Sequence, residues 1–195
     1  MWKSGKLELG WGFGAMLALA LLAGAGSVLP LVLLSALCHE WGHLGALRLA
    51  GAKVERLRLT AFGAEILADT RYLPYPAEIL CTLAGPAVNL ILALIFSRVT
   101  GDYVLAGANL LLGAFNLLPI PSLDGGRALY LLASWWADPG AADQLCRRVG
   151  LGCSLLLAAA ALILTLWHGA GLFLLLGALG TLLPQLPRRR ARIPV

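Results

Sequence analysis

Long runs of apolar residues, separated by short stretches that contain polar residues, glycine or proline, make up most of this chain. Such runs predict membrane-spanning helices when they reach roughly 17–25 residues. The predicted spans are about 11–25, 28–50, 75–98, 103–120, 149–167 and 170–186. Several are close to the lower length limit, so the last two fit either two spans or one re-entrant hairpin.

A different pattern occupies the stretch between the second and third apolar runs. Residues 56–59 alternate between arginine and leucine, and Gly63 interrupts the run that follows. Alternation of this kind is typical of a strand, and an edge strand can pair with an extended substrate. An amphipathic connector is the alternative. The expected fold is an all-α polytopic membrane protein with about six transmembrane helices and a membrane-surface β-strand or hairpin between spans two and three.

The composition supports a membrane location. Of the 195 residues, 59% are hydrophobic and only 13% are charged, whereas about a quarter of the residues in a soluble domain carry charge. The length fits a single transmembrane domain over 1–195. The apolar run after Lys3 and Lys6 has no clear cleavage region, so it predicts a retained first span instead of a signal peptide.

The distribution of basic residues predicts the orientation of the bundle. With the N-terminus in the cytosol, all but Arg98 of the 15 lysines and arginines fall in inside segments, as the positive-inside rule requires. Both termini are then cytosolic, and the basic tail 187–195 lies near anionic lipid. Membrane topology accounts for the net charge of +5, so the lipid bilayer is an expected partner and nucleic acid is not.

The second apolar run contains the motif His39-Glu40-Trp41-Gly42-His43. Histidines four residues apart lie on one face of a helix within roughly 5–6 Å, and two imidazoles at that distance suit one Zn²⁺ ion. Glu40 can accept a proton from a water on the same metal, which is how a zinc hydrolase attacks a peptide carbonyl. Ionisable groups at membrane depth are candidates for function.

A third ligand is needed, because catalytic zinc sites usually have three protein ligands and a water. Asp124 supplies a carboxylate after the fourth run. Pro119 and Pro121 should break that helix, and Gly125 and Gly126 allow close backbone approach. The predicted orientation places the zinc roughly 10–15 Å below the cytosolic face, in the membrane half that also contains Asp124. An ordinary surface turn is the alternative for this segment.

Other residues do not form a competing metal site. No close pair of cysteines has zinc-ribbon spacing, so Cys38, Cys81, Cys146 and Cys153 predict buried thiols. His168, the only other histidine, is predicted at the outer side. A non-catalytic zinc-binding membrane protein or transporter is therefore a less favoured alternative, since a transporter would place ionisable groups on several helices along a path.

Three motifs in this order resemble those of the site-2 protease family of intramembrane zinc metalloproteases. The motifs are His39-Glu40-x-x-His43, Gly85-Pro86-Ala87-Val88-Asn89 and Asn116-x-x-Pro119-x-x-x-x-Asp124-Gly125. The resemblance covers about residues 28–130, the expected catalytic core. The run from Gly51 to Ile66 is most similar to the branch that contains stage IV sporulation protein FB. The length leaves no room for an inserted PDZ domain, and we expect no C-terminal CBS domain of the kind that this branch carries.

The resemblance implies a zinc endopeptidase that cleaves a membrane-associated protein near the cytosolic face of a bacterial cell membrane. His39, His43 and Asp124 would be the zinc ligands. Glu40 would be the general base and later the proton donor. Asn116 would hold the substrate or polarise the scissile carbonyl, in the manner of an oxyanion donor.

Three further positions are carried over from the same motifs. Asn89, Gly85 and Pro119 would contribute to substrate positioning, and helix packing with one interhelical hydrogen bond is the alternative for Gly85 and Asn89. The implied substrate is the precursor of a sporulation sigma factor. A general site-2 protease that cuts anti-sigma factors or signal-peptide remnants is the alternative. Membrane inhibitor or regulator proteins are further expected partners.

Overall fold

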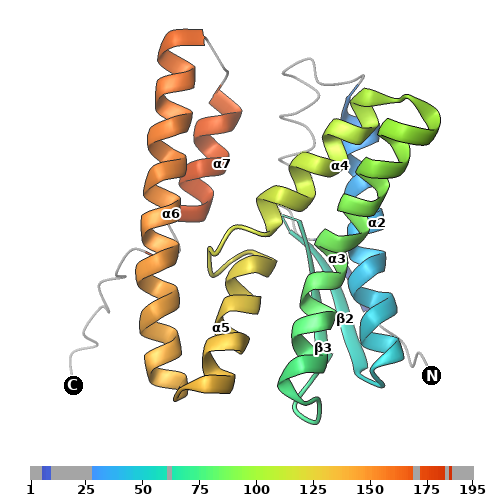
Figure 1. Cartoon of the computed structure of the whole chain (residues 1–195), viewed down its shortest axis with the longest axis vertical. Helices are drawn as coiled ribbons and strands as arrows, with labels where there is room; N and C mark the ends of the chain where they lie inside the picture. Colours follow the sequence, from blue (N-terminus) through green and yellow to red (C-terminus); the bar gives the residue numbers. More distant parts are fainter. Residues whose placement is uncertain (1–5, 10–27, 61–62, 169–171, 183–184, 186–195) are drawn as a thin grey trace.

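The computed structural model describes residues 6–9, 28–60, 63–168, 172–182 and 185 (Figure 1). The predicted first span, 11–25, and the basic tail lie outside these residues. Six α-helices occur within the described part of the chain. They are α2 (Leu29–Leu49), α3 (Tyr75–Ile95), α4 (Tyr103–Asn116), α5 (Asp124–Trp136), α6 (Pro139–His168) and α7 (Leu172–Leu182).

The helices form two groups that α5 connects. Helix α3 packs against α2, α4 and α5, whereas α6 packs against α5 and α7. Figure 1 shows α2, α3 and α4 on one side, α6 and α7 on the other, and the short α5 between them. Because α3 contacts both α2 and α5, residues from those two helices can meet beside it.

The strands form a small sheet beside α2. Strands β1 (Lys6–Leu9), β2 (Lys53–Thr60) and β3 (Gly63–Asp69) pair in the order β1-β2-β3. Strands β2 and β3 are antiparallel, and β1 runs parallel to β2. The hairpin predicted between spans two and three is confirmed, whereas β1 was not predicted. Pairing of an edge strand with an extended substrate stays a prediction.

Two turns connect the sheet to the helices. The chain leaves α2 through Gly51, whose φ of +79° favours glycine. After β3, hydrogen bonds from Arg71 lower the pKa of the Asp69 carboxyl to about 2. Thr70 then donates a 2.9 Å hydrogen bond to Glu78 in the first turn of α3. These contacts tie the end of the sheet to the start of the central helix.

Two helices in the described residues are long and apolar enough to cross a membrane. They are Tyr75–Thr100, which is α3 with its π-helical extension Phe96–Thr100, and Pro139–Trp167 of α6. Large apolar side chains are exposed on both, such as Ile91 (57%) and Leu156 (73%). Exposed apolar surface of this kind is unfavourable in water and favourable in lipid.

Five of the six predicted spans correspond to described helices whose ends differ from the prediction, and the first predicted span lies outside the described residues. Span 28–50 corresponds to α2, and span 75–98 to α3 with its extension. Helix α4 ends at Asn116 instead of residue 120, because proline at position 119 cannot continue a helix. Helix α6 begins at Pro139, ten residues before the predicted start at 149, since a helix can continue beyond the apolar layer. Span 170–186 corresponds to α7, of which the structure describes the 11 residues Leu172–Leu182.

Candidate metal centre

His39 and His43 lie on the buried face of α2, together with Ser35 and Leu47. The four positions are four residues apart, so they form one stripe along the helix. Only 5% of His39 and 8% of His43 are exposed. Their Nε2 atoms are 3.1 Å apart, which confirms the predicted approach of the two rings.

Asp124 is the first residue of α5, a helix that the sequence analysis did not predict. The helix begins directly after the turn that follows α4. A Cβ atom on Gly125 would overlap the carbonyl of Leu117, and one on Gly126 would overlap the carbonyl of Ile120. The two glycines therefore let the first turn of α5 pack against the preceding turn. The expectation of close backbone approach is confirmed, whereas an ordinary surface turn after span four is not what forms here.

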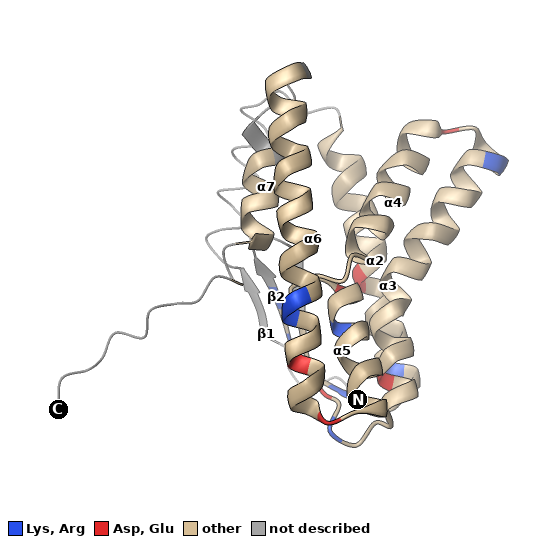
Figure 2. Cartoon of the chain, turned by 60° about the vertical axis from the view of Figure 1, so that its left-hand side comes forward, with Lys and Arg blue, Asp and Glu red and all other residues tan. Residues whose placement is uncertain are grey.

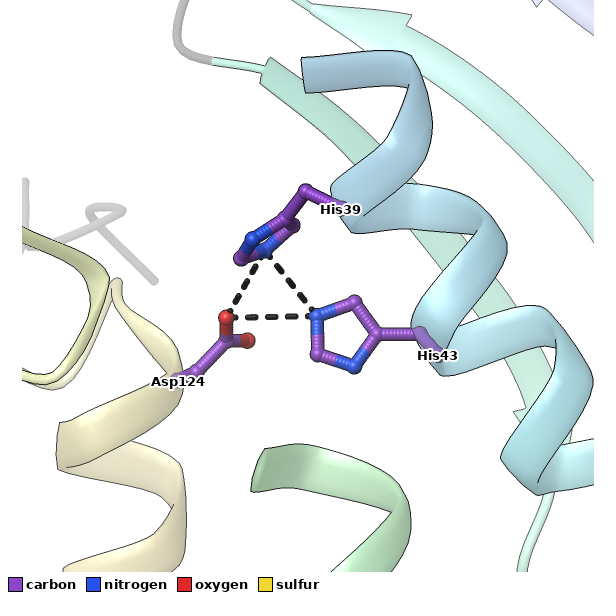
Figure 3. A group of neighbouring side chains, drawn as sticks. All are labelled: His39, His43 and Asp124. Atoms are coloured by element: carbon purple, nitrogen blue, oxygen red, sulfur yellow. Dashed lines mark hydrogen bonds and ion pairs between the residues drawn. The ribbon is translucent and has the colours of Figure 1, made fainter. Parts of the chain in front are cut away.

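The three predicted ligands converge at one point (Figure 3). Oδ2 of Asp124 lies 3.0 Å from Nε2 of His39 and 3.2 Å from Nε2 of His43. The two imidazole rings are almost perpendicular, with an interplanar angle of 80°. In the described residues this is the one group of three or more histidine, cysteine or acidic side chains that could hold a metal ion.

The donor set fits zinc. Bonds of about 2.0–2.1 Å at tetrahedral angles place ligand atoms roughly 3.3 Å apart, close to the 3.0–3.2 Å separations seen here. Nδ1 of His43 donates to the carbonyl of Cys81 at 2.9 Å. A carbonyl only accepts, so the lone pair of that ring is on Nε2, toward Asp124. Cys81 contributes its backbone alone. Of the four cysteines predicted to be buried, Cys81 and Cys146 are buried, whereas Cys38 and Cys153 are partly exposed.

Helix α3 forms the wall behind both histidines. Gly85 lies directly against the ring of His43, because a Cβ atom built there would overlap Nε2 and its neighbouring ring carbons. Four residues later, Oδ1 of Asn89 lies 2.6 Å from Nδ1 of His39. Gly85 and Asn89 thus contact the two metal-binding rings. Their predicted part in substrate positioning stays a prediction.

Replacing Gly85 with alanine is expected to lower zinc affinity by roughly 10-fold or more, in the range found for residues that orient ligands. The added methyl group would occupy the space of the His43 Nε2 atom. Competition with a fluorescent chelator measures the affinity. Gly107→Ala is the matched control, because nothing lies within 4 Å of a Cβ atom at that position. Equal zinc affinity in the two variants would show that Gly85 is not needed for the site.

An ion pair connects α5 to α3 one turn beyond Asp124. Nη2 of Arg127 lies 2.9 Å from Oε1 of Glu78, the oxygen that also accepts from Thr70. Half of the Arg127 side chain is exposed, so the pair contributes only about 0–1 kcal/mol to stability. Its geometric effect is to hold the first turn of α5, and with it Asp124, against α3.

The remaining predicted residues lie near the same elements. Glu40 follows His39 on α2 and is partly exposed. Asn116 is the last residue of α4, and its amide nitrogen donates to the carbonyl of Leu112 at 3.0 Å. Pro119 is partly buried in the turn between α4 and α5. The predicted roles of Glu40, Asn116 and Pro119 remain predictions.

One residue near the site escaped the sequence analysis. Asn109 of α4 is 1% exposed and bonds to both Asn89 and Ser35. A single asparagine in an apolar run belongs to no recognisable motif. The sequence contains one indication of its role: a buried amide in an apolar segment is unfavourable unless it has hydrogen-bond partners on neighbouring helices.

Comparisons with known proteins find similarity to zinc metalloproteases. Residues 98–157 match the model of Peptidase family M50. A zinc metalloprotease of Methanocaldococcus jannaschii is 31% identical over 115 residues, which are 53% of this chain and 33% of that protein. The protein Rip3 of Mycobacterium tuberculosis, which carries the name of a zinc metalloprotease, is 35% identical over 147 residues, or 68% of this chain and 36% of Rip3. The chain spans about a third of the length of these curated relatives.

A solved structure has the same fold. The site-2 protease from Methanocaldococcus jannaschii superimposes with a TM-score of 0.71, over 95% of this chain and 92% of that one. The two sequences are 24% identical. The likeness extends over the whole helical arrangement, and thus well beyond the segment that matches the family model.

Proposed function

We propose that this chain is an intramembrane zinc endopeptidase of the M50, or site-2 protease, type, because residues 98–157 match the model of Peptidase family M50 and two similar proteins carry the name of zinc metalloproteases. The observation that carries the proposal is the convergence of His39, His43 and Asp124 inside a bundle with an apolar surface. These three side chains would hold the metal. Two histidines and one carboxylate would leave the fourth position of a zinc ion for a water, as hydrolysis of a peptide bond requires.

The chain's own residues account for the proton transfers. Zinc, when bound, supplies Lewis-acid polarisation of an oxygen. The Glu40 carboxylate accepts a proton from the attacking water and delivers it to the leaving amide nitrogen. The amide nitrogen of Asn116 carries two hydrogens. One is used by the carbonyl of Leu112, and we propose that the other is donated to the scissile carbonyl oxygen.

The distribution of charge supports cleavage near the cytosolic face. Figure 2 shows charged residues gathered toward the end of the helices where α5 leads into α6, and a second, smaller group at the connection between α3 and α4. That connection contains Arg98 and Asp102. A basic end facing the cytosol agrees with the positive-inside rule. We propose that both termini are cytosolic and that the protein is a multi-pass protein of a bacterial cell membrane.

The physiological substrate is a finer proposal. The similarity of residues 51–66 to the sporulation branch favours the precursor of a sporulation sigma factor. An anti-sigma factor or a signal-peptide remnant is the alternative, and it would present a single transmembrane segment. Side-by-side cleavage of a sigma-factor precursor and single-span peptides by the same preparation separates the two classes.

Reconstitution in proteoliposomes tests the activity itself. The full chain is expected to cleave a membrane-associated substrate near the cytosolic face, and the N-terminal sequence of the product locates the cut. Removing the metal with a chelator should reduce cleavage to background, and added Zn²⁺ should restore it. Stoichiometric zinc binding without cleavage of either substrate class would instead favour a non-catalytic zinc protein or a transporter.

A further inference from the structure

A continuous set of hydrogen bonds connects three helices to the ring of His39. Its members are Ser35 of α2, Asn89 of α3 and Asn109 of α4, which are 1%, 0% and 1% exposed. Buried polar groups in an apolar bundle are unfavourable unless every one of them is bonded. Here all three side chains are hydrogen-bonded. Along the network, each side chain accepts a hydrogen bond from the member nearer His39 and donates one to the next group.

A backbone carbonyl fixes the orientation of the Asn109 amide. The carbonyl of Leu105 accepts from Nδ2 of Asn109 at 2.9 Å, and the same nitrogen donates to Oγ of Ser35 at 3.0 Å. Because a backbone carbonyl cannot donate, this end of the Asn109 amide must be the nitrogen. The Ser35 hydroxyl in turn donates to the carbonyl of Leu31 at 2.9 Å. The oxygen of the Asn109 amide therefore faces Asn89.

The same reasoning fixes the orientation of the Asn89 amide. Its Nδ2 atom donates to Oδ1 of Asn109 at 2.9 Å and to the carbonyl of Ser35 at 3.1 Å. Both amide hydrogens are then used, and Oδ1 is left 2.6 Å from Nδ1 of His39. An amide oxygen only accepts, so Nδ1 of His39 must carry the hydrogen. The lone pair of that ring is consequently on Nε2, the atom that lies 3.0 Å from Asp124.

We propose that Asn109, supported by Ser35, is a positioning residue that sets the tautomer and orientation of the metal ligand His39 through Asn89. This inference rests on the proposed zinc site and deepens it. Without Asn109, the carbonyl of Ser35 is the single group in the described network that keeps the Asn89 amide from turning over. A reversed amide would present its nitrogen to His39 and favour the tautomer that has no lone pair on Nε2.

The two histidines differ in how they are held. His43 is fixed by the carbonyl of Cys81, a backbone group that side-chain substitutions on α4 leave in place. His39 depends on the side chains of Asn89 and Asn109. A loss of Asn109 should therefore affect one ring and spare the other, which a general loss of packing would not do.

The test is Asn109→Leu in the full chain, purified in lipid nanodiscs. Zinc affinity from chelator competition is expected to fall about 10–100-fold, the range for residues that orient metal ligands. Asn109→Asp keeps an oxygen that can accept from Asn89 and should recover part of the loss. Ser154→Ala is the matched control, because Ser154 is also fully buried and hydrogen-bonded, but lies on α6. It should bind zinc like the wild type.

Nitrogen NMR of the histidine rings in the metal-free protein provides the second measurement. The wild type should have hydrogen on Nδ1 of both rings, and Asn109→Leu should change the tautomer of His39 alone. Wild-type zinc affinity together with an unchanged His39 tautomer in Asn109→Leu would overturn the inference. If that variant does not fold, Ser35→Ala removes one hydroxyl and is judged by the same outcomes. Failure of the wild type to bind zinc would overturn the proposed function instead.

Discussion

Glu40→Gln is expected to lower the rate of substrate cleavage by about 10²–10⁴-fold, the usual contribution of a general base. Glutamine has nearly the same size and cannot accept a proton. Glu40 is adjacent to a histidine of the centre, but it is not one of the three converging groups. Zinc affinity should therefore stay within about threefold of the wild type. Product formation in proteoliposomes and chelator competition on the same sample measure the two effects.

Glu55→Gln serves as the control for this experiment. Glu55 is an exposed residue of β2, at the irregularity in the pairing of β2 with β3. The same change of a carboxylate to an amide at that position should leave both cleavage and zinc binding intact. Undiminished cleavage by Glu40→Gln would exclude Glu40 as the base. Loss of zinc together with cleavage would assign Glu40 to the metal centre instead.

Asp124→Ala is expected to lower zinc affinity by roughly 10²–10³-fold, because one of three or four ligands contributes on the order of 3–4 kcal/mol of the total. The two imidazoles would remain, and the ion would lose the carboxylate whose Oδ2 atom lies between them. Cleavage should fall to background in parallel. Chelator competition and the cleavage assay measure the two effects.

A second aspartate distinguishes loss of a ligand from loss of charge. Asp143 is exposed on α6, where it pairs with Arg147 at 3.0 Å. Asp143→Ala should retain wild-type zinc affinity. The unfolding temperature of both metal-free variants shows whether the bundle is intact. Zinc affinity that is unchanged in Asp124→Ala would remove Asp124 from the ligand set.

Local patterns predicted part of the fold well. Apolar runs located the helices, and the alternation at residues 56–59 located β2. The pattern did not predict β1, because a four-residue strand gains its stability from a distant partner. It also placed the start of α6 too late. Hydropathy measures where a helix can contact lipid, whereas polar residues between Pro139 and Arg148 continue the same helix beyond that layer.

The metal ligands were predictable because their residue types are costly in an apolar segment. His39 and His43 have helical spacing, and Asp124 has the proline and glycine neighbours of a broken helix. Helix α5 was not predicted, since two consecutive glycines usually indicate a turn. The two glycines are required by tertiary packing, because both lie against carbonyls of the turn before them. Asn109 was missed for a similar reason, because the side chains to which it bonds are on other helices.

The position of Asp124 along the chain has a consequence for the newly made protein. It follows His43 by 81 residues, and a ribosome adds roughly 5–20 residues per second. The histidines of α2 therefore enter the membrane on the order of 4–16 s before their carboxylate partner exists. Helix α3, with the residues that contact both rings, is synthesised within that interval. The centre can be completed only when α5 docks against α3, so the growing chain has no complete zinc site while its first helices are being inserted.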